Sequence, residues 1–262
     1  MMRLYFTVGP PLLTAIIICA AIEVIVGRGW IADYVLPPPS QVWKALAEPD
    51  TDLWTGGASG RTLGGMASTA LNATIGFVIS AGLGISIAVA LSSNRWIKQA
   101  FFPYAVFFQT VPIVAIAHMR VILLDYGSPT VRAAACIASI FPVIANTYAG
   151  LAETDPALRE LFQLYRAGWF ATMFKLRLPS ALPSIFTGLR IAAGLAVIGA
   201  IVGEFIGGGG LGAVIDTAKP QLRNDKIFAA VLLASLLGLI MVSTINLIGW
   251  LVLRRWHASE RP

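Results

Sequence analysis

Ionisable residues are scarce in this chain, and five of them lie inside long apolar runs: Glu23, Arg120, Arg132, Arg190 and Glu204. A charge removed from water needs a partner, a water-filled cavity or a route to the surface, so each is a functional candidate. Arg132 and Arg190 lie close enough to the ends of their runs for their side chains to extend to a polar boundary. Arg120 lies deeper, and its separation from Asp125 does not favour a helical ion pair.

No pairing of nucleophile and base emerges from the sequence. The two histidines, His118 and His257, are far apart, and the two cysteines, Cys19 and Cys136, lie in apolar runs without metal-ligand spacing. An intramembrane hydrolase requires a nucleophile and a base within hydrogen-bond reach. The pattern therefore does not favour catalysis, and no metal site is expected.

The composition is typical of an integral membrane protein. Apolar residues make up 57% of the 262 residues and charged residues only 12%, about half the charged fraction of a soluble domain. The net charge of +6 does not indicate nucleic-acid binding, because the basic residues lie at the ends of apolar segments, as membrane orientation requires.

Six apolar segments approach or exceed the roughly 20 residues that a membrane-spanning helix needs. They are about Val8–Val26, Thr62–Leu91, Ala100–Leu124, Thr130–Gly150, Ile185–Ile206 and Ile227–Leu253. We expect the first to be an uncleaved span, because Glu23 interrupts the region where a signal peptide would be cleaved. The sequence thus predicts an all-α bundle of six transmembrane helices.

The distribution of basic residues predicts that both termini are cytoplasmic. With this orientation the cytoplasmic segments hold Arg3, Arg95, Lys98, Arg159, Arg166, Lys175, Arg177, Arg254, Arg255 and Arg261. The outer segments hold fewer basic residues and more acidic ones, as the positive-inside rule requires. We divide the chain into residues 1–61, a first span with an outer interfacial helix; residues 62–253, a core with a cytoplasmic loop at 151–184; and a tail, 254–262.

Several interior positions are candidates for a translocation pathway. Gln109, Pro112 and Asn146 place amides and a proline at membrane depth, where a freed carbonyl is tolerated only inside protein or beside water; simple kinks explain them equally well. In the second span, small or weakly polar residues recur every four positions: Ser68, Asn72, Gly76, Ser80 and Gly84. Such a stripe permits close helix packing and is also compatible with sliding during gating.

The fifth span ends in Glu204 followed by four glycines, Gly207, Gly208, Gly209 and Gly210. This stretch is either a connector that lets Leu211–Thr217 fold back as a short helix, or an outer gate hinge with Glu204 at its base. A phosphate-binding loop is not expected, because no Lys-Ser/Thr follows the glycines.

Between Leu151 and Ile185 the chain becomes polar, basic and rich in aromatic residues. We expect two short amphipathic helices separated by Gly168 and closed by Leu178-Pro179, lying in the cytoplasm. The pattern resembles the cytoplasmic coupling loop of permease subunits in binding-protein-dependent ABC importers. That resemblance assigns the ATPase-coupling residues Asp155, Glu160, Leu161, Arg166, Ala167, Gly168, Leu178 and Pro179.

From about Leu36 to Leu253 the chain resembles permeases of the nitrate/sulfonate/taurine/bicarbonate type. The landmarks are Leu36-Pro37-Pro38-Pro39-Ser40, Phe141-Pro142 with Asn146, Leu178-Pro179 with Pro183, Thr187-Gly188-Leu189-Arg190, and Gly203-Glu204-Phe205 with Gly210-Leu211-Gly212. The family's Glu-Ala-Ala becomes Glu160-Leu161-Phe162, and its glycine becomes Arg166. Because arginine adopts a positive-φ turn less readily than glycine, we predict that Gly168 makes this turn instead.

The resemblance implies the type I importer permease fold (MetI-like) in a bacterial-type inner membrane. It implies that two permease copies form the pore, that a cytoplasmic ATPase subunit binding ATP and Mg²⁺ docks on the loop, and that an extracytoplasmic solute-binding protein delivers the solute. This chain would bind no cofactor itself. The solute classes implied are sulfonate, nitrate, bicarbonate and pyrimidine or vitamin precursors.

Two other classes of function remain open at this point. An ion- or proton-coupled secondary transporter would use Glu204, Arg120 and Asp125 as a relay, but it predicts inverted repeats that the sequence does not display. A membrane scaffold or sensor is the second alternative, favoured if Arg166 disables coupling. An ATPase gene beside that of this chain would favour the importer over both.

Overall fold

The computed structural model describes residues 2–47, 64–93, 96, 99 and 127–254, and over these residues the chain is helical and contains no strand. The helices are α1 (Met2–Gly27), α2 (Pro39–Ala47), α4 (Gly65–Ser93), α7 (Ser128–Ala152), α8 (Pro156–Leu164), α9 (Trp169–Thr172), the π-helical segment η1 (Met173–Arg177), α10 (Leu178–Gly207), α11 (Gly210–Ala218) and α12 (Asn224–Leu253). The prediction of an all-α protein is confirmed.

Four of these helices are long and apolar enough to cross a bilayer: α4, α7, α12 and the continuous helix Trp169–Gly207. A shorter apolar helix, Leu13–Gly27, lies within α1. The span expected at Ala100–Leu124 lies outside the described residues, so the count of six stays a prediction. A chain with this many apolar spans is a multi-pass membrane protein.

Helix α7 is the centre of the bundle because α4 and α10 both approach its backbone closely. A Cβ placed on Gly84 of α4 would meet the Val143 side chain of α7 at 2.8 Å, and one on Gly199 of α10 would meet the Ala134 carbonyl oxygen at 2.7 Å. The hydroxyl oxygens of Ser80 and Ser139 are 2.8 Å apart across the α4–α7 contact. Small residues therefore fix the helix spacing, as in other membrane bundles.

The register of the α4 stripe differs slightly from the predicted one. Asn72, Gly76, Ser80 and Gly84 are buried as expected, whereas Ser68 is only half-buried and Thr69 takes the buried position. A helix turns 3.6 residues per turn, so a strict four-residue spacing drifts around its surface. The first member of the stripe is therefore displaced from the packed face.

The second helix of the cytoplasmic loop does not end at Leu178-Pro179, which corrects our expectation. Residues Trp169–Gly207 form one helix of 39 residues through α9, η1 and α10. Pro179 stands at the beginning of α10, directly after the π-helical segment. A π-bulge rearranges the backbone hydrogen bonds that a proline would otherwise interrupt, so the loop passes into the span without a break.

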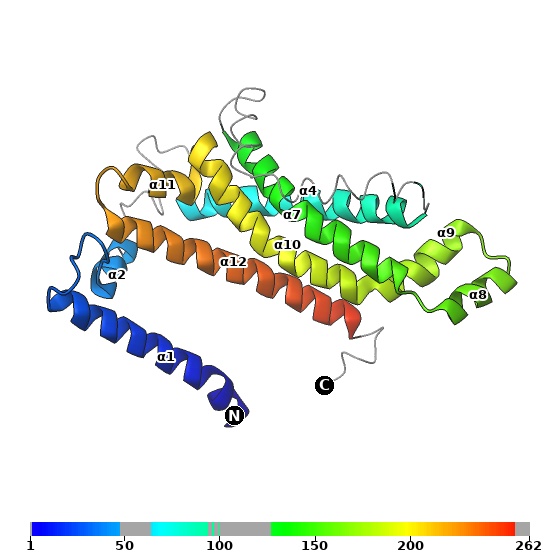
Figure 1. Ribbon diagram of the computed structural model, residues 1–262, viewed down its shortest axis with the longest axis horizontal. Helices are drawn as coiled ribbons and strands as arrows, with labels where there is room; N and C mark the ends of the chain where they lie inside the picture. Colours follow the sequence, from blue (N-terminus) through cyan, green and yellow to red (C-terminus); the bar gives the residue numbers. More distant parts are fainter. Residues whose placement is uncertain (1, 48–63, 94–95, 97–98, 100–126, 255–262) are drawn as a thin grey trace.

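The short helices lie at opposite ends of the bundle (Figure 1). At one end α2 and α11 pack on the beginning of α12 through a cluster that includes Val42, Leu211, Val214 and Leu233. At the other end α8 and α9 extend beyond the spans, and α12 ends nearby (Figure 1). The bundle thus separates a compact end from a projecting end.

Candidate functional site

The projecting end is formed by α8, which begins with a side-chain cap. Asp155 precedes the helix and accepts a hydrogen bond from the Ala157 amide at 2.8 Å. Asp155 is followed by Pro156 at the first helical position, a sequence typical of a helix start. The local sequence therefore determines where the predicted coupling helix begins.

Helix α8 has no buried residue, and its leucine side chains are exposed, whereas Phe162 is half-buried. Leu158 and Leu161 are both more than 40% exposed, Leu164 is 81% exposed and Tyr165 is 80% exposed. On the adjacent α9, Phe170 is 72% exposed. Glu160 is also exposed. Large apolar side chains gathered beyond the spans are typical of a protein interaction surface.

Arg166, not Gly168, makes the turn after α8, so our prediction for this turn is wrong. Arg166 has φ 51°, whereas Gly168 is extended with φ −65°. The Ala167 amide donates to the Phe162 carbonyl and the Arg166 amide to the Gln163 carbonyl, both at 2.9 Å. This is a Schellman motif with arginine at the position that usually holds glycine. The turn geometry is kept although its residue has changed.

Two arginines attach this loop to the ends of α7 and α4. Arg159 of α8 donates to the carbonyls of Leu151 and Ala152 at 3.2 and 2.7 Å. Arg177 donates to the carbonyls of Leu151 and Ser92 at 3.1 and 3.3 Å. The last carbonyls of a helix lack internal partners and carry a partial negative charge. The guanidinium groups therefore supply the caps that the helix ends lack.

At the compact end, Glu204 is buried, with 1% of its surface exposed, and it caps α11. Its carboxylate accepts hydrogen bonds from the Thr69 hydroxyl at 2.8 Å and from the Gly212 amide at 2.9 Å. The Thr69 oxygen in turn accepts from the Leu211 amide at 2.9 Å. Two free amides of the first turn of α11 are thus satisfied by side chains of α4 and α10.

The glycines after α10 are required by this cap. Gly208, Gly209 and Gly210 all have positive φ, at 75°, 84° and 66°. A Cβ on Gly210 would overlap the Glu204 carboxylate, and one on Gly212 would lie 2.6 Å from the Glu204 Cβ. The glycines therefore allow the chain to reverse and to bring the α11 amides onto the carboxylate. The role of Glu204 and Gly207–Gly210 as a gate stays a prediction.

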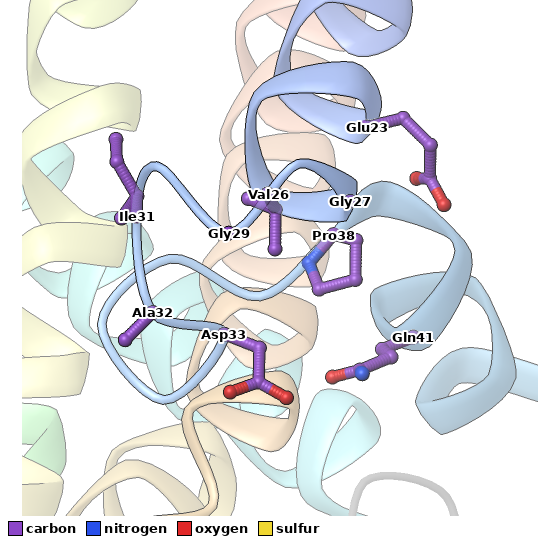
Figure 2. A pocket seen from close by; sticks show the side chains of 9 residues that line it. All are labelled: Glu23, Val26, Gly27, Gly29, Ile31, Ala32, Asp33, Pro38 and Gln41. Carbon is purple, nitrogen blue, oxygen red and sulfur yellow. The ribbon is translucent and has the colours of Figure 1, made fainter.

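Glu23 has the same role at the end of α1. Its carboxylate accepts hydrogen bonds from the Ser40 hydroxyl at 2.7 Å and from the Ser40 amide at 3.2 Å, in the first turn of α2. Figure 2 shows the junction, where Glu23, Asp33 and Gln41 line a cavity of about 330 Å³. The carboxylate of the helix before it thus supplies an N-terminal cap for α2.

Arg132 and Arg190, the two candidates from the apolar runs, are paired with amides rather than acids. The Arg132 Nε donates to the Asn72 Oδ1 at 3.0 Å, linking α7 to α4. The Arg190 Nε donates to the Asn246 Oδ1, linking α10 to α12. An amide oxygen satisfies the donor but leaves the charge uncompensated. The sequence singled out both arginines but not their partnership with these amides.

The remaining pathway candidates are only partly covered. Gln109, Pro112 and Arg120 lie outside the described residues. The Asn146 Nδ2 donates to the Pro142 carbonyl of its own helix at 2.9 Å. Gly188 of α10 faces this pair, because a Cβ there would lie 2.8 Å from the Pro142 oxygen. A pathway role for Asn146 is therefore still a prediction.

Sequence reasoning missed Thr69 and the pair of arginines at the helix ends. A hydroxyl one position from the predicted stripe was a usable signal for Thr69. Arg159 caps carbonyls only seven and eight residues earlier in the chain. No local signal predicts the role of Arg177, because the Ser92 carbonyl that it caps lies 85 residues earlier. Among the residues that the structure describes, no group of three metal-ligating side chains occurs.

Comparison with known proteins places these features in context. A family model described as "Binding-protein-dependent transport system inner membrane component" matches residues 53–257. The formylaminopyrimidine transport permease protein ThiX of Halalkalibacterium halodurans is 33% identical over 214 residues, which is 81% of this chain and 82% of ThiX. A probable ABC transporter permease of Haemophilus influenzae is 30% identical over 93% of this chain and 95% of its own length. The putative aliphatic sulfonates transport permease SsuC of Bacillus subtilis is 27% identical over 95% of this chain and 87% of its own length.

Proposed function

Because the chain belongs to the family of inner membrane components of binding-protein-dependent transport systems, we propose that it moves a small anionic or polar organic solute inward by alternating access. Members of this family are permease subunits and not enzymes, and ATP hydrolysis resides in a separate subunit. The relatives named above serve varied solutes, among them a formylaminopyrimidine and aliphatic sulfonates.

The exposed apolar surface of α8 and α9 is the observation that carries the proposal. Leu161 and Leu164 are exposed beyond the ends of the spans, and an ATPase subunit would cover them on the cytoplasmic side. An extracytoplasmic solute-binding protein would dock at the opposite end, where α2 and α11 lie. Both termini would then be cytoplasmic in a bacterial-type inner membrane.

The coupling residues have distinct roles in this proposal. Asp155 fixes the beginning of α8, Arg166 makes its final turn, and Leu178-Pro179 joins the loop to the span. The continuous helix Trp169–Gly207 offers a direct mechanical connection. When ATP closes the ATPase dimer, movement of α8 and α9 would tilt this helix and open the bundle outward.

The arginines support an anionic solute and a second permease copy. Arg190 and Asn246 lie on a face of α10 and α12 that this single chain leaves exposed. An arginine within an apolar span is costly where its head meets lipid, so this face is expected to meet protein or water. Two copies facing each other here would enclose a pathway, and the uncompensated charge of Arg190 favours an anion. Competition for uptake between sulfonates and neutral pyrimidines would decide the solute class.

The docking proposal is tested by co-expression and co-purification of this chain with a cytoplasmic ABC ATPase subunit. We expect Leu164→Asp to reduce the bound ATPase about tenfold or more, as loss of a central apolar contact does. Leu222→Asp is the matched control, because Leu222 is 70% exposed between α11 and α12 at the other end. Neither change touches a buried side chain. Unchanged ATPase binding by Leu164→Asp, with uptake intact, would disprove docking on α8.

A further inference from the structure

Arg159 and Arg177, at the base of α8, line one cavity. No described side chain that lines it balances their positive charge. Arg159 and Arg177 border a partly open cavity of about 520 Å³, together with Ser92, Tyr148 and Ala152. No carboxylate is among the residues that line it. Two cationic groups therefore border one cavity that has no carboxylate among its described lining residues.

The supply of hydrogen-bond acceptors is also too small. Each guanidinium has five N–H donors, but the acceptors that both arginines reach are the carbonyls of Ser92, Leu151 and Ala152. The Leu151 oxygen alone receives both arginines and the Thr154 hydroxyl, at 3.1 to 3.2 Å. A carbonyl oxygen has two lone pairs, so this acceptor is overcommitted.

Two further donors are buried and unpaired. Within the described part of the chain, the Nε atoms of Arg159 and Arg177 are buried and have no hydrogen-bond partner. A buried donor without an acceptor is costly, and more so when it is charged. The neighbouring acids do not compensate: Glu153 and Glu160 are exposed, Asp155 caps α8, and no ion pair of either arginine occurs among the described residues. The described acceptors therefore do not satisfy the donors of the two guanidinium groups.

The position of the cavity indicates which anion fits. Ser92 is the second-last residue of the α4 span, and Ala152 is the last residue of the α7 span. The cavity therefore lies at the level where two apolar spans end, which is the level of lipid headgroups. Guanidinium forks match phosphate oxygens in geometry, and they are the usual choice for binding phosphate.

We propose that Arg159 and Arg177 form a phosphate-binding site at the base of the loop 151–184. The phosphate belongs either to the headgroup of an anionic phospholipid or to a free phosphate ion. Bound there, it would neutralise both arginines and tie α8 to the ends of α4 and α7. The proposal is independent of which solute is transported, because the site lies outside the span interior.

Lipid retention by the purified full-length permease, without its ATPase, tests the site. In nanodiscs of phosphatidylglycerol and phosphatidylcholine, native mass spectrometry should detect phosphatidylglycerol retained by the wild type. Arg159→Gln and Arg177→Gln should retain it about tenfold less or worse, as expected for loss of one charge-assisted hydrogen bond. Arg254→Gln is the matched control, because Arg254 stacks on Trp250 and does not line the cavity.

A second variant guards against misfolding of the arginine variants. Ala152→Asp would place a carboxylate beside the arginines, so it should raise the unfolding temperature of delipidated protein and abolish lipid retention. If the source is free phosphate, inorganic phosphate should raise the unfolding temperature of the wild type but not of Ala152→Asp, with no lipid retained.

Three results would overturn the proposal. The first is equal retention by the wild type and Ala152→Asp, together with no effect of inorganic phosphate. The second is an equal loss of lipid with Arg254→Gln, which would indicate a diffuse surface charge rather than a site. The third is stabilisation of the wild type, in the same unfolding assay, only when the ATPase is present. That result would assign the cavity to an acidic side chain of the ATPase subunit.

Discussion

Removal of the Thr69 hydroxyl should release the first turn of α11 from the bundle. Thr69→Val deletes the donor to the Glu204 carboxylate and the acceptor of the Leu211 amide. Both Thr69 and Leu211 are fully buried. A buried amide without an acceptor costs about 1–3 kcal/mol, and a lost hydrogen bond to a charged group about 1.5–3 kcal/mol. Taking the lower part of both ranges, we expect a local cost of about 3 kcal/mol.

Hydrogen–deuterium exchange of the purified permease measures this cost where it arises. A change of about 3 kcal/mol in local opening speeds exchange roughly 100-fold, and the effect should be confined to peptides that contain Leu211 and Gly212. Thr69→Ser keeps the hydroxyl and should exchange almost as the wild type does. Thr217→Val is the matched control, because Thr217 lies on α11 but bonds only to carbonyls of its own helix.

Two outcomes would contradict this prediction. If Thr69→Val leaves the exchange of the α11 amides unchanged, Glu204 alone holds the helix and the bridge through Thr69 is not needed. If Thr69→Ser accelerates exchange as much as Thr69→Val, packing of the methyl group and not the hydroxyl is responsible.

Three further predictions concern turns, caps and packing. Arg166→Gly should stabilise the α8 turn by about 1 kcal/mol in thermal unfolding, since a left-handed conformation is costly for arginine. Gly168→Val should be tolerated, because Gly168 is extended with open space around it. The reverse order of stabilities would mean that Gly168 makes the turn, as the sequence predicted. Glu23→Gln should weaken the α2 cap by about 1 kcal/mol, seen as faster exchange in α2; unchanged exchange would show that the cap is dispensable. Gly199→Val should destabilise the bundle by about 1–3 kcal/mol or more through overpacking. Gly194→Val should not destabilise it, because nothing lies near a Cβ at that position. Equal unfolding temperatures of the two variants would contradict the close approach of α10 to α7.

The compositional and periodic features of the sequence determined the class of the fold. Apolar segments of spanning length predict transmembrane helices without reference to tertiary contacts, because unpaired backbone groups are excluded from lipid. The amphipathic helix after Asp155 and the short helix after Leu36-Pro37-Pro38 follow from local capping and proline geometry, and both appear as α8 and α2. These signals act over a few residues, so a single sequence contains them.

The partners of the ionisable residues were decided by the tertiary structure. Glu204 and Glu23 are N-terminal caps of α11 and α2, and the amides that they bind belong to segments whose approach the sequence does not encode locally. The same holds for Arg177, which caps the end of α4, 85 residues earlier in the chain. The turn at Arg166 also differs from the prediction. The conformational preference of glycine favoured Gly168, but the two hydrogen bonds that close α8 require the left-handed residue to follow the helix directly, at Arg166. Helix packing selects which distant backbone groups meet each charge, and composition alone cannot make that selection.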